Sequence, residues 1–308
     1  MDIDLLSNIL YAMVRTGTPL LLVALGELVC EKSGVLNLGQ EGMLLMGAVV
    51  GFVAALLSGS LIIGFLLAIL AGVSMSLLFG LIALGFSANQ VATGLALTIF
   101  GTGLSAFIGS EFVGKPIDGL DPFALPLLSE IPLIGKMLFA QDLVVYLSFA
   151  LFFAVYWFFR SSRAGLVVKA VGENPHAANA IGLPVMRTRY FAVMFGGAMA
   201  GLAGGYLSIA YTPLWAENMS AGRGWIALAL VVFASWKVER VLLGAWLFGL
   251  ASILHLVFQG LGFSISSNLL ATLPYAATIL VLVLLSRNQV RARLLAPISL
   301  GKPFHANS

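Results

Sequence analysis

Polar side chains continue into the start of a hydrophobic segment in EKSGVLNLGQEGMLLMGA, residues 31–48. Asn37, Gln40 and Glu41 fall where a helix should enter a membrane. Polar groups at membrane depth are costly unless they face a cavity or one another, so they indicate a candidate transport pathway. The alternative for Glu41 is an interfacial position, packed against a loop. Glycines within 34–47 also permit a discontinuous helix whose free backbone groups line a cavity.

A second stretch, SANQVATGLALT at residues 87–98, is polar without a single charge. Gln90, Thr93 and Leu97 share one helical face by their spacing. Such a face suits a neutral solute that forms hydrogen bonds better than it suits an ion. Hydrogen bonding between helices is the competing explanation.

A third stretch, SAGRGWIALALVVFASW at residues 220–236, again opens with glycines around a polar residue and then becomes apolar. It is short for a membrane span, so we expect a broken or re-entrant helix. It should run in the opposite direction to residues 39–58, which hints at an inverted repeat, a common plan for transporters. The three stretches together predict these pathway residues: Asn37, Gln40, Glu41, Met43, Phe86, Asn89, Gln90, Thr93 and Trp225.

No catalytic or metal-binding set is evident. The three histidines are scattered without zinc spacing, and the single cysteine, Cys30, excludes an intramolecular disulfide. The motif G-x-x-x-x-G-K-[ST] does not occur, so the chain has no P-loop of its own for ATP. Nucleic-acid binding has no support, because the basic residues form no patch.

The stretch KAVGENPHAANAIGLPVMRTR, residues 169–189, encodes a short polar helix between two apolar segments. Asn174 can cap it, Pro175 suits its first position, and Gly182 followed by Pro184 ends it. About two helical turns are unstable alone in water, so we expect this helix to gain its order from a partner surface. A helix lying on the membrane surface is the alternative.

The elements that position these residues must be membrane helices. The 308-residue chain is 60% hydrophobic and 9% charged, with a mean hydropathy of +1.04, whereas soluble domains carry about 25% charged residues. Continuous apolar runs favour a single all-α domain over residues 1–308, a polytopic bundle of about 8–10 transmembrane helices with discontinuous or re-entrant segments. We expect spans near 10–30, 39–58, 61–85, 89–110, 141–159, 190–211, 222–236, 239–260 and 268–286.

The distribution of Lys and Arg predicts the orientation. If loop 160–189 is cytoplasmic, twelve of the sixteen basic residues share its side and four lie opposite, which agrees with the positive-inside rule. The C-terminus is then cytoplasmic, while loop 111–140 and the N-terminus lie outside. On the sixth span, Gly197, Gly201 and Gly205 form a face of small residues, which favours packing inside the bundle over a subunit interface.

Three of these segments together resemble one family: GELVCEKSGVLNLGQEGMLLMGA, SSRAGLVVKAVGENPHAANAIGL and GRGWIALALVVFA. The chain is similar, over about residues 15–290, to the permease subunits of bacterial ABC importers for nucleosides and simple sugars, within the branched-chain amino acid and ribose permease superfamily. The resemblance implies that the loop of residues 160–189 carries a coupling helix that docks on the ATPase. The corresponding positions here are Arg163, Gly165, Gly172, Glu173, Asn174, Pro175, Ala177, Ala178 and Gly182.

The same resemblance implies a multi-pass protein of the bacterial inner membrane that binds no cofactor directly and uses ATP through a partner ATPase. Its other partners would be a second, non-identical permease and an extracytoplasmic substrate-binding lipoprotein. A nucleoside is the expected solute. The alternatives are a simple sugar, or a secondary transporter that works without ATP.

Overall fold

The computed structural model describes residues 3–260, 272, 276 and 296–305, and its regular elements are helices, as expected. Within these ranges an isolated β-bridge pairs Pro116 with Leu214. The helices are α1 (Ile3–Lys32), α2 (Gln40–Ser58), α3 (Leu61–Gly80) with the π-helical turn η1 (Leu81–Gly85), α4 (Gln90–Gly109) with the 3₁₀ turn η2 (Ser110–Phe112), α5 (Ile134–Phe139), α6 (Leu143–Ser161), α7 (Arg163–Glu173), α8 (Pro175–Ala180), α9 (Val185–Gly205) with the π-helical turn η3 (Tyr206–Tyr211), α10 (Arg223–Phe233) and α11 (Val238–Gly260).

Six of the described helical stretches are long and apolar enough to cross a membrane: Ile3–Lys32, Gln40–Ser58, Leu61–Gly85, Gln90–Phe112, Leu143–Ser161 and Val185–Tyr211. Helix α10 is a shorter apolar helix of 11 residues, and α11 matches the span expected at 239–260. The last expected span, 268–286, lies outside the described residues except for positions 272 and 276. The chain is therefore a multi-pass membrane protein.

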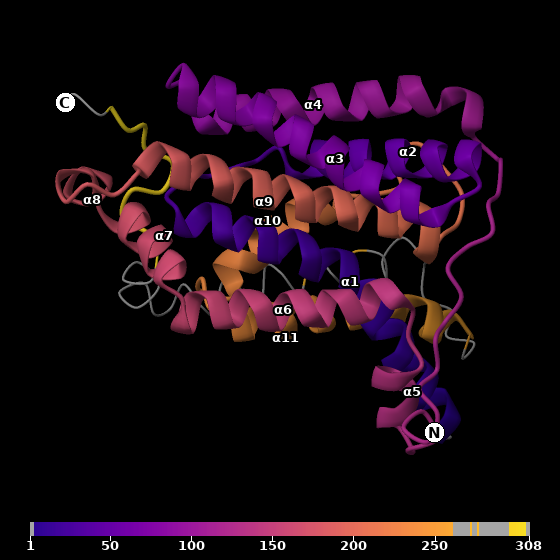
Figure 1. The fold of residues 1–308 in the computed structure, drawn as a ribbon. Helices are drawn as coiled ribbons and strands as arrows, with labels where there is room; N and C mark the ends of the chain where they lie inside the picture. The colour runs from indigo at the N-terminus through magenta and orange to yellow at the C-terminus, as the bar shows by residue number, and fades with distance from the viewer. Residues whose placement is uncertain (1–2, 261–271, 273–275, 277–295, 306–308) are drawn as a thin grey trace.

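Helices α1, α2 and α9 form the centre of the bundle. In the most apolar 18-residue stretch of each of these helices, 67–83% of the residues are buried. The corresponding share in α3, α4 and α6 is 28–33%. Figure 1 shows α9 and α1 running between α3 and α4 on one side and α6 and α11 on the other. The peripheral helices present apolar faces outward, as expected for surfaces in contact with lipid.

Glycines let the central helices approach closely. A Cβ on Gly201 would collide with the backbone of Ala68 in α3, and one on Gly47 would collide with the backbone of Gly201. The small-residue face of α9 therefore packs inside the bundle, which confirms the sequence-based preference.

The two polar loops lie at opposite ends of the molecule. Helices α7 and α8 stand at one end together with the C-terminal residues 296–305, while α5 and the N-terminus lie at the other end (Figure 1). This arrangement follows from an odd number of long helices between the loops: one, α6, separates 111–140 from 160–189.

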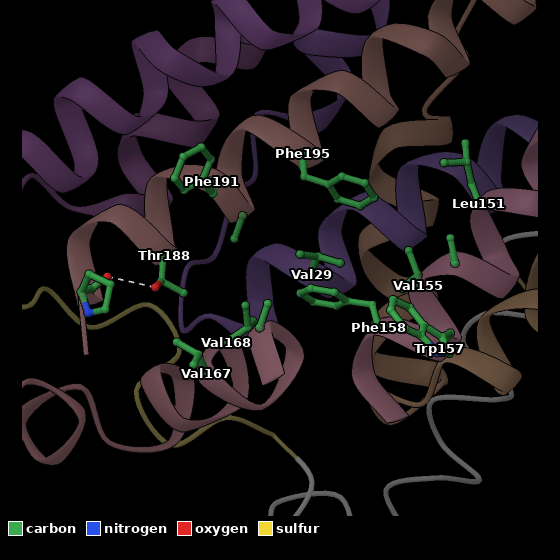
Figure 2. Close-up of a pocket in the computed structure, with 14 residues that line it drawn as sticks. Val29, Leu151, Val155, Trp157, Phe158, Val167, Val168, Thr188, Phe191 and Phe195 are labelled. Atoms are coloured by element: carbon green, nitrogen blue, oxygen red, sulfur yellow. Dashed lines mark hydrogen bonds between the residues drawn. The ribbon is translucent and has the colours of Figure 1, made fainter. Parts of the chain in front are cut away.

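An apolar cavity of about 660 Å³ opens on the side of the bundle between α1, α6, α7 and α9 (Figure 2). It lies where α6 ends and α9 begins, so it belongs to the end of the molecule that carries α7 and α8.

Candidate functional site

The carboxylate of Glu41 in the first turn of α2 binds the beginning of α10. Glu41 Oε1 accepts hydrogen bonds from the Ser220 hydroxyl at 2.5 Å and from the backbone N–H of Gly222 at 2.9 Å, and Oε2 accepts from the N–H of Gly224 at 2.6 Å. The first N–H groups of a helix have no partner within the helix and carry partial positive charge, which favours an anion there. Glu41 thus caps a helix that follows it by some 180 residues.

Both helices joined by this contact begin inside the bundle. The Gln40 side chain at the start of α2 lies against Gly196, which follows Val185 by eleven residues, about 16 Å along α9. Gly224 packs on the backbone of Glu41, so α10 begins at the same depth. Eleven residues of α10 extend about 16 Å, roughly half of a bilayer core. The short third stretch is therefore a half-helix, as the sequence predicts.

The non-helical residues before α2 are held by a second carboxylate, that of Glu27 in α1. Glu27 Oε1 accepts from the N–H of Asn37 at 3.0 Å, and Oε2 accepts from the Gln40 amide at 2.6 Å. Asn37 Oδ1 accepts from the N–H of Gly39 at 2.9 Å, and its amide contacts the sulfur of Met43. The side chains of these four residues, Glu27, Asn37, Gln40 and Met43, are fully buried. The non-helical backbone at membrane depth therefore finds its hydrogen-bond partners within the protein.

The far end of α10 is held by a third carboxylate. The indole N–H of Trp236 donates to Glu31 Oε2 at 2.5 Å, where the chain leaves α10 with positive φ at Ser235 and Trp236. The half-helix is thus fixed at its start by Glu41 and just past its end by Glu31. Sequence reasoning missed Glu31, Ser220, Gly222 and Gly224 as site residues, although an acidic side chain inside an apolar segment is itself a signal.

Two of the expected pathway residues keep a buried polar atom without a partner among the described residues: Gln40 Oε1 and Gln90 Nε2. The orientation of each amide is determined by its other bond. Gln90 Oε1 accepts from the N–H of Leu36 at 2.9 Å, and Gln40 donates to a carboxylate. One free acceptor, on Gln40, and one free donor, on Gln90, therefore belong to side chains of or bonded to the segment 36–40.

Of the remaining expected pathway residues, two lie at the start of α4, one follows η1 and one lies on α10. Asn89 caps α4 by accepting from the N–H of Ala92 at 3.0 Å, and the Thr93 hydroxyl donates to the Asn89 carbonyl at 2.9 Å. Phe86 is 75% exposed at the end of η1, and Trp225 is 38% exposed on α10. The structure thus brings Asn37, Gln40, Glu41 and Met43 together, connects Gln90 to them through Leu36, and leaves Phe86 apart.

The short helix α8 has the predicted start and stop. Asn174 Oδ1 accepts from the N–H of Ala177 at 3.0 Å, Pro175 occupies the first position, and Gly182 has φ +82°. Ala177 is exposed, whereas Ala178 is 3% exposed. Ala178 packs in a small apolar cluster together with Val171, Val185 and Phe304.

The glycines of α7 serve contacts within the chain. Gly172 lies against the carbonyl of Lys32 and the N–H of Gly34, and Gly165 lies against the carbonyl of Phe158. No larger residue fits at either position without moving backbone. Arg163 and Glu173, by contrast, are exposed.

The C-terminal residues 296–305 clamp this end of the bundle through Arg189 of α9, a feature that sequence reasoning missed. The buried Arg189 guanidinium donates to the carbonyl of Ser33 at 3.2 Å, to the carbonyl of Lys302 at 3.3 Å and to the Ser299 hydroxyl at 3.3 Å. Ser299 in turn donates to the carbonyl of Gly172. One cation thus joins the turn after α1, the end of α7 and the C-terminal segment.

The sequence as a whole matches a family model described as "Branched-chain amino acid transport system / permease component" over residues 9–285. The chain belongs to this permease family. The resemblance drawn from the three motifs is confirmed, and the chain is a permease subunit of a transport system.

Relatives of this permease include proteins named for sugars and for nucleosides. It is 39% identical to TsgC13 of Haloferax volcanii, which carries the provisional name of a glucose ABC transporter permease protein, over 97% of this chain and 98% of the relative. It is 33% identical to the guanosine ABC transporter permease protein NupQ of Bacillus subtilis, over 92% and 93%. It is 29% identical to the nucleoside ABC transporter permease protein NupC of Lactococcus lactis subsp. cremoris, over 92% and 93%.

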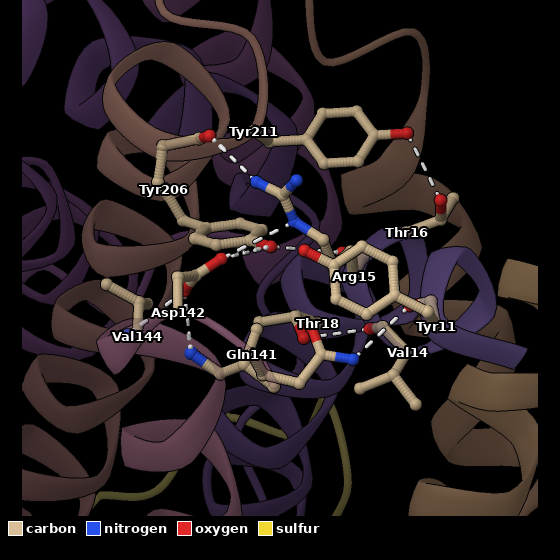
Figure 3. Close-up of polar contacts among 12 residues, drawn as sticks. Tyr11, Val14, Arg15, Thr16, Thr18, Gln141, Asp142, Val144, Tyr206 and Tyr211 are labelled. Carbon is tan, nitrogen blue, oxygen red and sulfur yellow. Dashed lines mark hydrogen bonds and ion pairs between the residues drawn. The ribbon is translucent and has the colours of Figure 1, made fainter. Parts of the chain in front are cut away.

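The opposite half of this permease contains a second polar cluster that joins α1, α6 and η3 (Figure 3). Arg15 Nε lies 3.5 Å from Asp142 Oδ2, and the same guanidinium donates to the carbonyl of Ala210 at 3.0 Å. The Tyr206 hydroxyl donates to Asp142, which also caps α6 by accepting from the N–H groups of residues 144 and 145. The pair is part-buried on the arginine side and fully buried on the aspartate side, so it fixes these three helices relative to one another.

Proposed function

We propose that the chain is the permease half of an ATP-driven importer and takes up a neutral polar solute, a nucleoside in the first place. The observation that carries this proposal is the meeting of α2 and α10, which both begin inside the bundle and are joined by Glu41. Transporters use discontinuous helices of this kind to build a pathway near the middle of the membrane. Parting α10 from α2 would open such a pathway.

The free polar atoms of the cluster suit an uncharged solute. Gln40 Oε1 can accept a hydrogen bond and Gln90 Nε2 can donate one, and both are otherwise without a partner in the described part of the chain. Buried polar atoms without partners are costly, so their presence supports a role in contacting a passing solute. Hydroxyl groups and base edges of a nucleoside offer both kinds of partner. Asn37, Asn89 and Thr93 would add to the same wall, with Met43 and Trp225 beside the rings, whereas Phe86, which lies apart, would not contact the solute.

A simple sugar is the second candidate, since TsgC13 is named for glucose whereas NupQ and NupC are named for nucleosides. Sugars and nucleosides share the hydroxyl groups that this wall would contact. A secondary transporter working without ATP has less support, because TsgC13, NupQ and NupC are all named as ABC transporter permeases.

Coupling to ATP hydrolysis would pass through α8. The exposed residues of α8 and of the position after it, among them His176, Ala177 and Ile181, form the surface that we assign to a partner ATPase. From there a continuous series of contacts leads inward: α8 follows α7, Gly172 of α7 packs on the turn at 32–34, and Arg189 ties the same turn to the C-terminal segment. That turn leads directly into Asn37 and Glu41. A shift of α8 would therefore reach the start of α2 and, through Glu41, the half-helix.

The complete transporter in this proposal contains a second, non-identical permease, a cytoplasmic ATPase and an extracytoplasmic substrate-binding lipoprotein. The chain would lie in the cytoplasmic membrane, with α7, α8 and the C-terminus on the cytoplasmic side and the N-terminus and loop 111–140 outside. ATP would bind only to the ATPase subunit.

Competition between solutes tests the proposal. Cells that express the chain with its second permease, ATPase and binding protein are given labelled guanosine or labelled glucose, and unlabelled nucleosides or glucose are added in excess. We expect an excess of unlabelled nucleosides to reduce the uptake of guanosine. An excess of glucose should leave guanosine uptake unchanged. Uptake of labelled glucose that nucleosides do not inhibit would support the sugar instead, and uptake of neither would contradict both candidates.

A further inference from the structure

The apolar cavity between α1, α6, α7 and α9 does not suit the polar solute of the proposed pathway. Its walls are formed by side chains such as Val29, Val155, Phe158, Val168 and Phe195 (Figure 2). The polar side chain that lines it, Thr188, donates its hydroxyl proton to the carbonyl of Pro184 at 2.9 Å. Because the Thr188 proton is already used, these walls offer a hydroxyl-rich solute few hydrogen bonds, whereas a hydrocarbon chain would lose nothing by entering.

The cavity lies at the side of the bundle, near one membrane boundary. Its rim contains Trp157, which is 62% exposed, and Phe191, which is 69% exposed. Tryptophan is enriched where the hydrocarbon core meets the headgroups. The volume of about 660 Å³ also falls within the range of about 300–1,000 Å³ that is typical of pockets for small molecules.

Three exposed arginines flank the cavity on the side of α7 and α8. Arg160 follows Trp157 by three residues on α6, Arg163 precedes Val167 by four on α7, and Arg187 precedes Phe191 by four on α9. Residues three or four apart are neighbours on a helix surface, so each arginine adjoins a side chain of the cavity wall. Arg160 donates to the Tyr156 hydroxyl, and neither Arg163 nor Arg187 forms an ion pair with another described residue.

We propose that this cavity binds one acyl chain of an anionic phospholipid, whose phosphate is held by Arg160, Arg163 and Arg187. An apolar wall below a cationic rim matches both parts of such a lipid, and basic pockets between membrane helices bind anionic headgroups. A neutral lipid would leave three cations at the rim without a counter-charge, whereas an anionic headgroup supplies one. The site lies apart from Glu41 and Gln40, so it is independent of the solute pathway.

Lipid retention by the purified full-length chain tests the proposal. The delipidated protein is given equal amounts of phosphatidylglycerol and phosphatidylcholine with the same acyl chains, and bound lipids are counted by native mass spectrometry. We expect phosphatidylglycerol to be retained preferentially, and the preference to fall about five-fold for each arginine replaced in Arg163→Gln and Arg187→Gln. The double variant Lys237→Gln/Arg240→Gln removes two cations away from the cavity and should keep the preference.

Filling the cavity tests the acyl-chain part separately. Ala154 is exposed and lines the cavity, whereas Ala150 is exposed on the same helix and does not. Ala154→Trp should abolish the retained lipid, and Ala150→Trp should not. Equal retention of the two lipids by the unmodified chain, or retention unaffected by Ala154→Trp, would overturn the proposal.

A photo-crosslinking amino acid at position 154 identifies the occupant in native membranes. An adduct with the mass of an anionic phospholipid supports the site. An adduct with another protein subunit would show that a helix covers the cavity and would overturn the proposal, whatever solute the chain transports.

Discussion

The carboxylate of Glu41 accepts a 2.6 Å hydrogen bond from the backbone N–H of Gly224, which follows Glu41 by 183 positions in the chain. Through this bond the first turn of α2 caps the first turn of the half-helix α10. The Gly222 N–H and the Ser220 hydroxyl bind the other carboxylate oxygen, so both oxygens of Glu41 accept hydrogen bonds from the start of α10. The contact joins the two polar stretches that the sequence marks most clearly.

Replacing Glu41 should therefore damage both stability and transport. In Glu41→Ala the N–H groups of Gly222 and Gly224 lose their acceptor, and each buried donor left unsatisfied costs about 1–3 kcal/mol. We expect uptake to fall ten-fold or more, because about 1.4 kcal/mol corresponds to a factor of ten. Glu41→Gln retains one acceptor oxygen, so its uptake and stability should lie between those of Glu41→Ala and those of the unmodified protein. Initial rates of solute uptake and the thermal stability of the detergent-solubilised protein measure both effects.

The matched control is Glu217→Ala, which removes an exposed carboxylate from the loop that precedes α10. It should leave uptake and stability unchanged. If Glu41→Ala behaves like Glu217→Ala, the capping contact has no part in transport.

Gln90 allows the free donor of the proposed pathway to be tested. Gln90→Glu keeps an acceptor for the Leu36 N–H but removes the free Nε2 donor and places a charge at membrane depth, which costs about 2.5–3.5 kcal/mol. Gln90→Ala introduces no charge, and the one hydrogen bond from Nε2 to the solute that it removes is worth about 0.5–1.5 kcal/mol, so its uptake should fall only about 2- to 12-fold. We expect Gln90→Glu to transport less than Gln90→Ala, with ATP hydrolysis reduced in parallel.

Accessibility to water gives an independent measure of the same wall. Cysteines placed at positions 37, 40, 90 and 93 in a Cys30→Ser background are probed with a water-soluble thiol reagent in each nucleotide state. At least one position should be labelled in one of these states. Absence of labelling at all four would show that these residues are packing contacts only.

Helix α8 offers two adjacent alanines in opposite environments. Ala177→Glu alters the exposed face and should abolish ATPase binding without affecting the fold. Ala178→Glu places a charge among Val171, Val185 and Phe304 and should lower thermal stability. Co-purification of the ATPase, together with thermal unfolding, separates the two effects. Normal co-purification and uptake with Ala177→Glu would remove α8 from the coupling surface.

Local features of the fold could be read from the sequence because they depend on residues close together in the chain. Hydrophobic runs predict the long helices, and Asn174, Pro175 and Gly182 predict α8 with its ends. The shortness of residues 222–236 predicts the half-helix. The small-residue face of α9 predicts close packing, since glycine spacing is visible without knowledge of the partner helix.

The partners across the chain could not be read in this way. Nothing in the spacing around Glu41 indicates residues 220–224, and nothing around Arg189 indicates Ser33, Ser299 and Lys302. Such contacts depend on how helices cross, which a hydrophobic pattern leaves open. The burial of Ala178 and Gly172 within the chain likewise depends on the C-terminal segment and on the turn after α1.

Orientation in the membrane is tested by reporter fusions. Fusions at residue 175 and after residue 300 should report the cytoplasm, and one at residue 125 should report the outside, because twelve of the sixteen basic residues lie on the side of loop 160–189. An outside signal from position 175 would reverse the topology and would contradict docking of α8 on a cytoplasmic ATPase.

Uptake by proteoliposomes tests the central claim most directly. The chain is reconstituted together with its second permease and ATPase, the binding protein is loaded with labelled solute on the outside, and ATP is enclosed within the vesicles. The account predicts accumulation that requires enclosed ATP, and that Glu41→Ala reduces ten-fold or more while Glu217→Ala does not. Accumulation at the same rate without ATP, or an unchanged rate in Glu41→Ala, would contradict it.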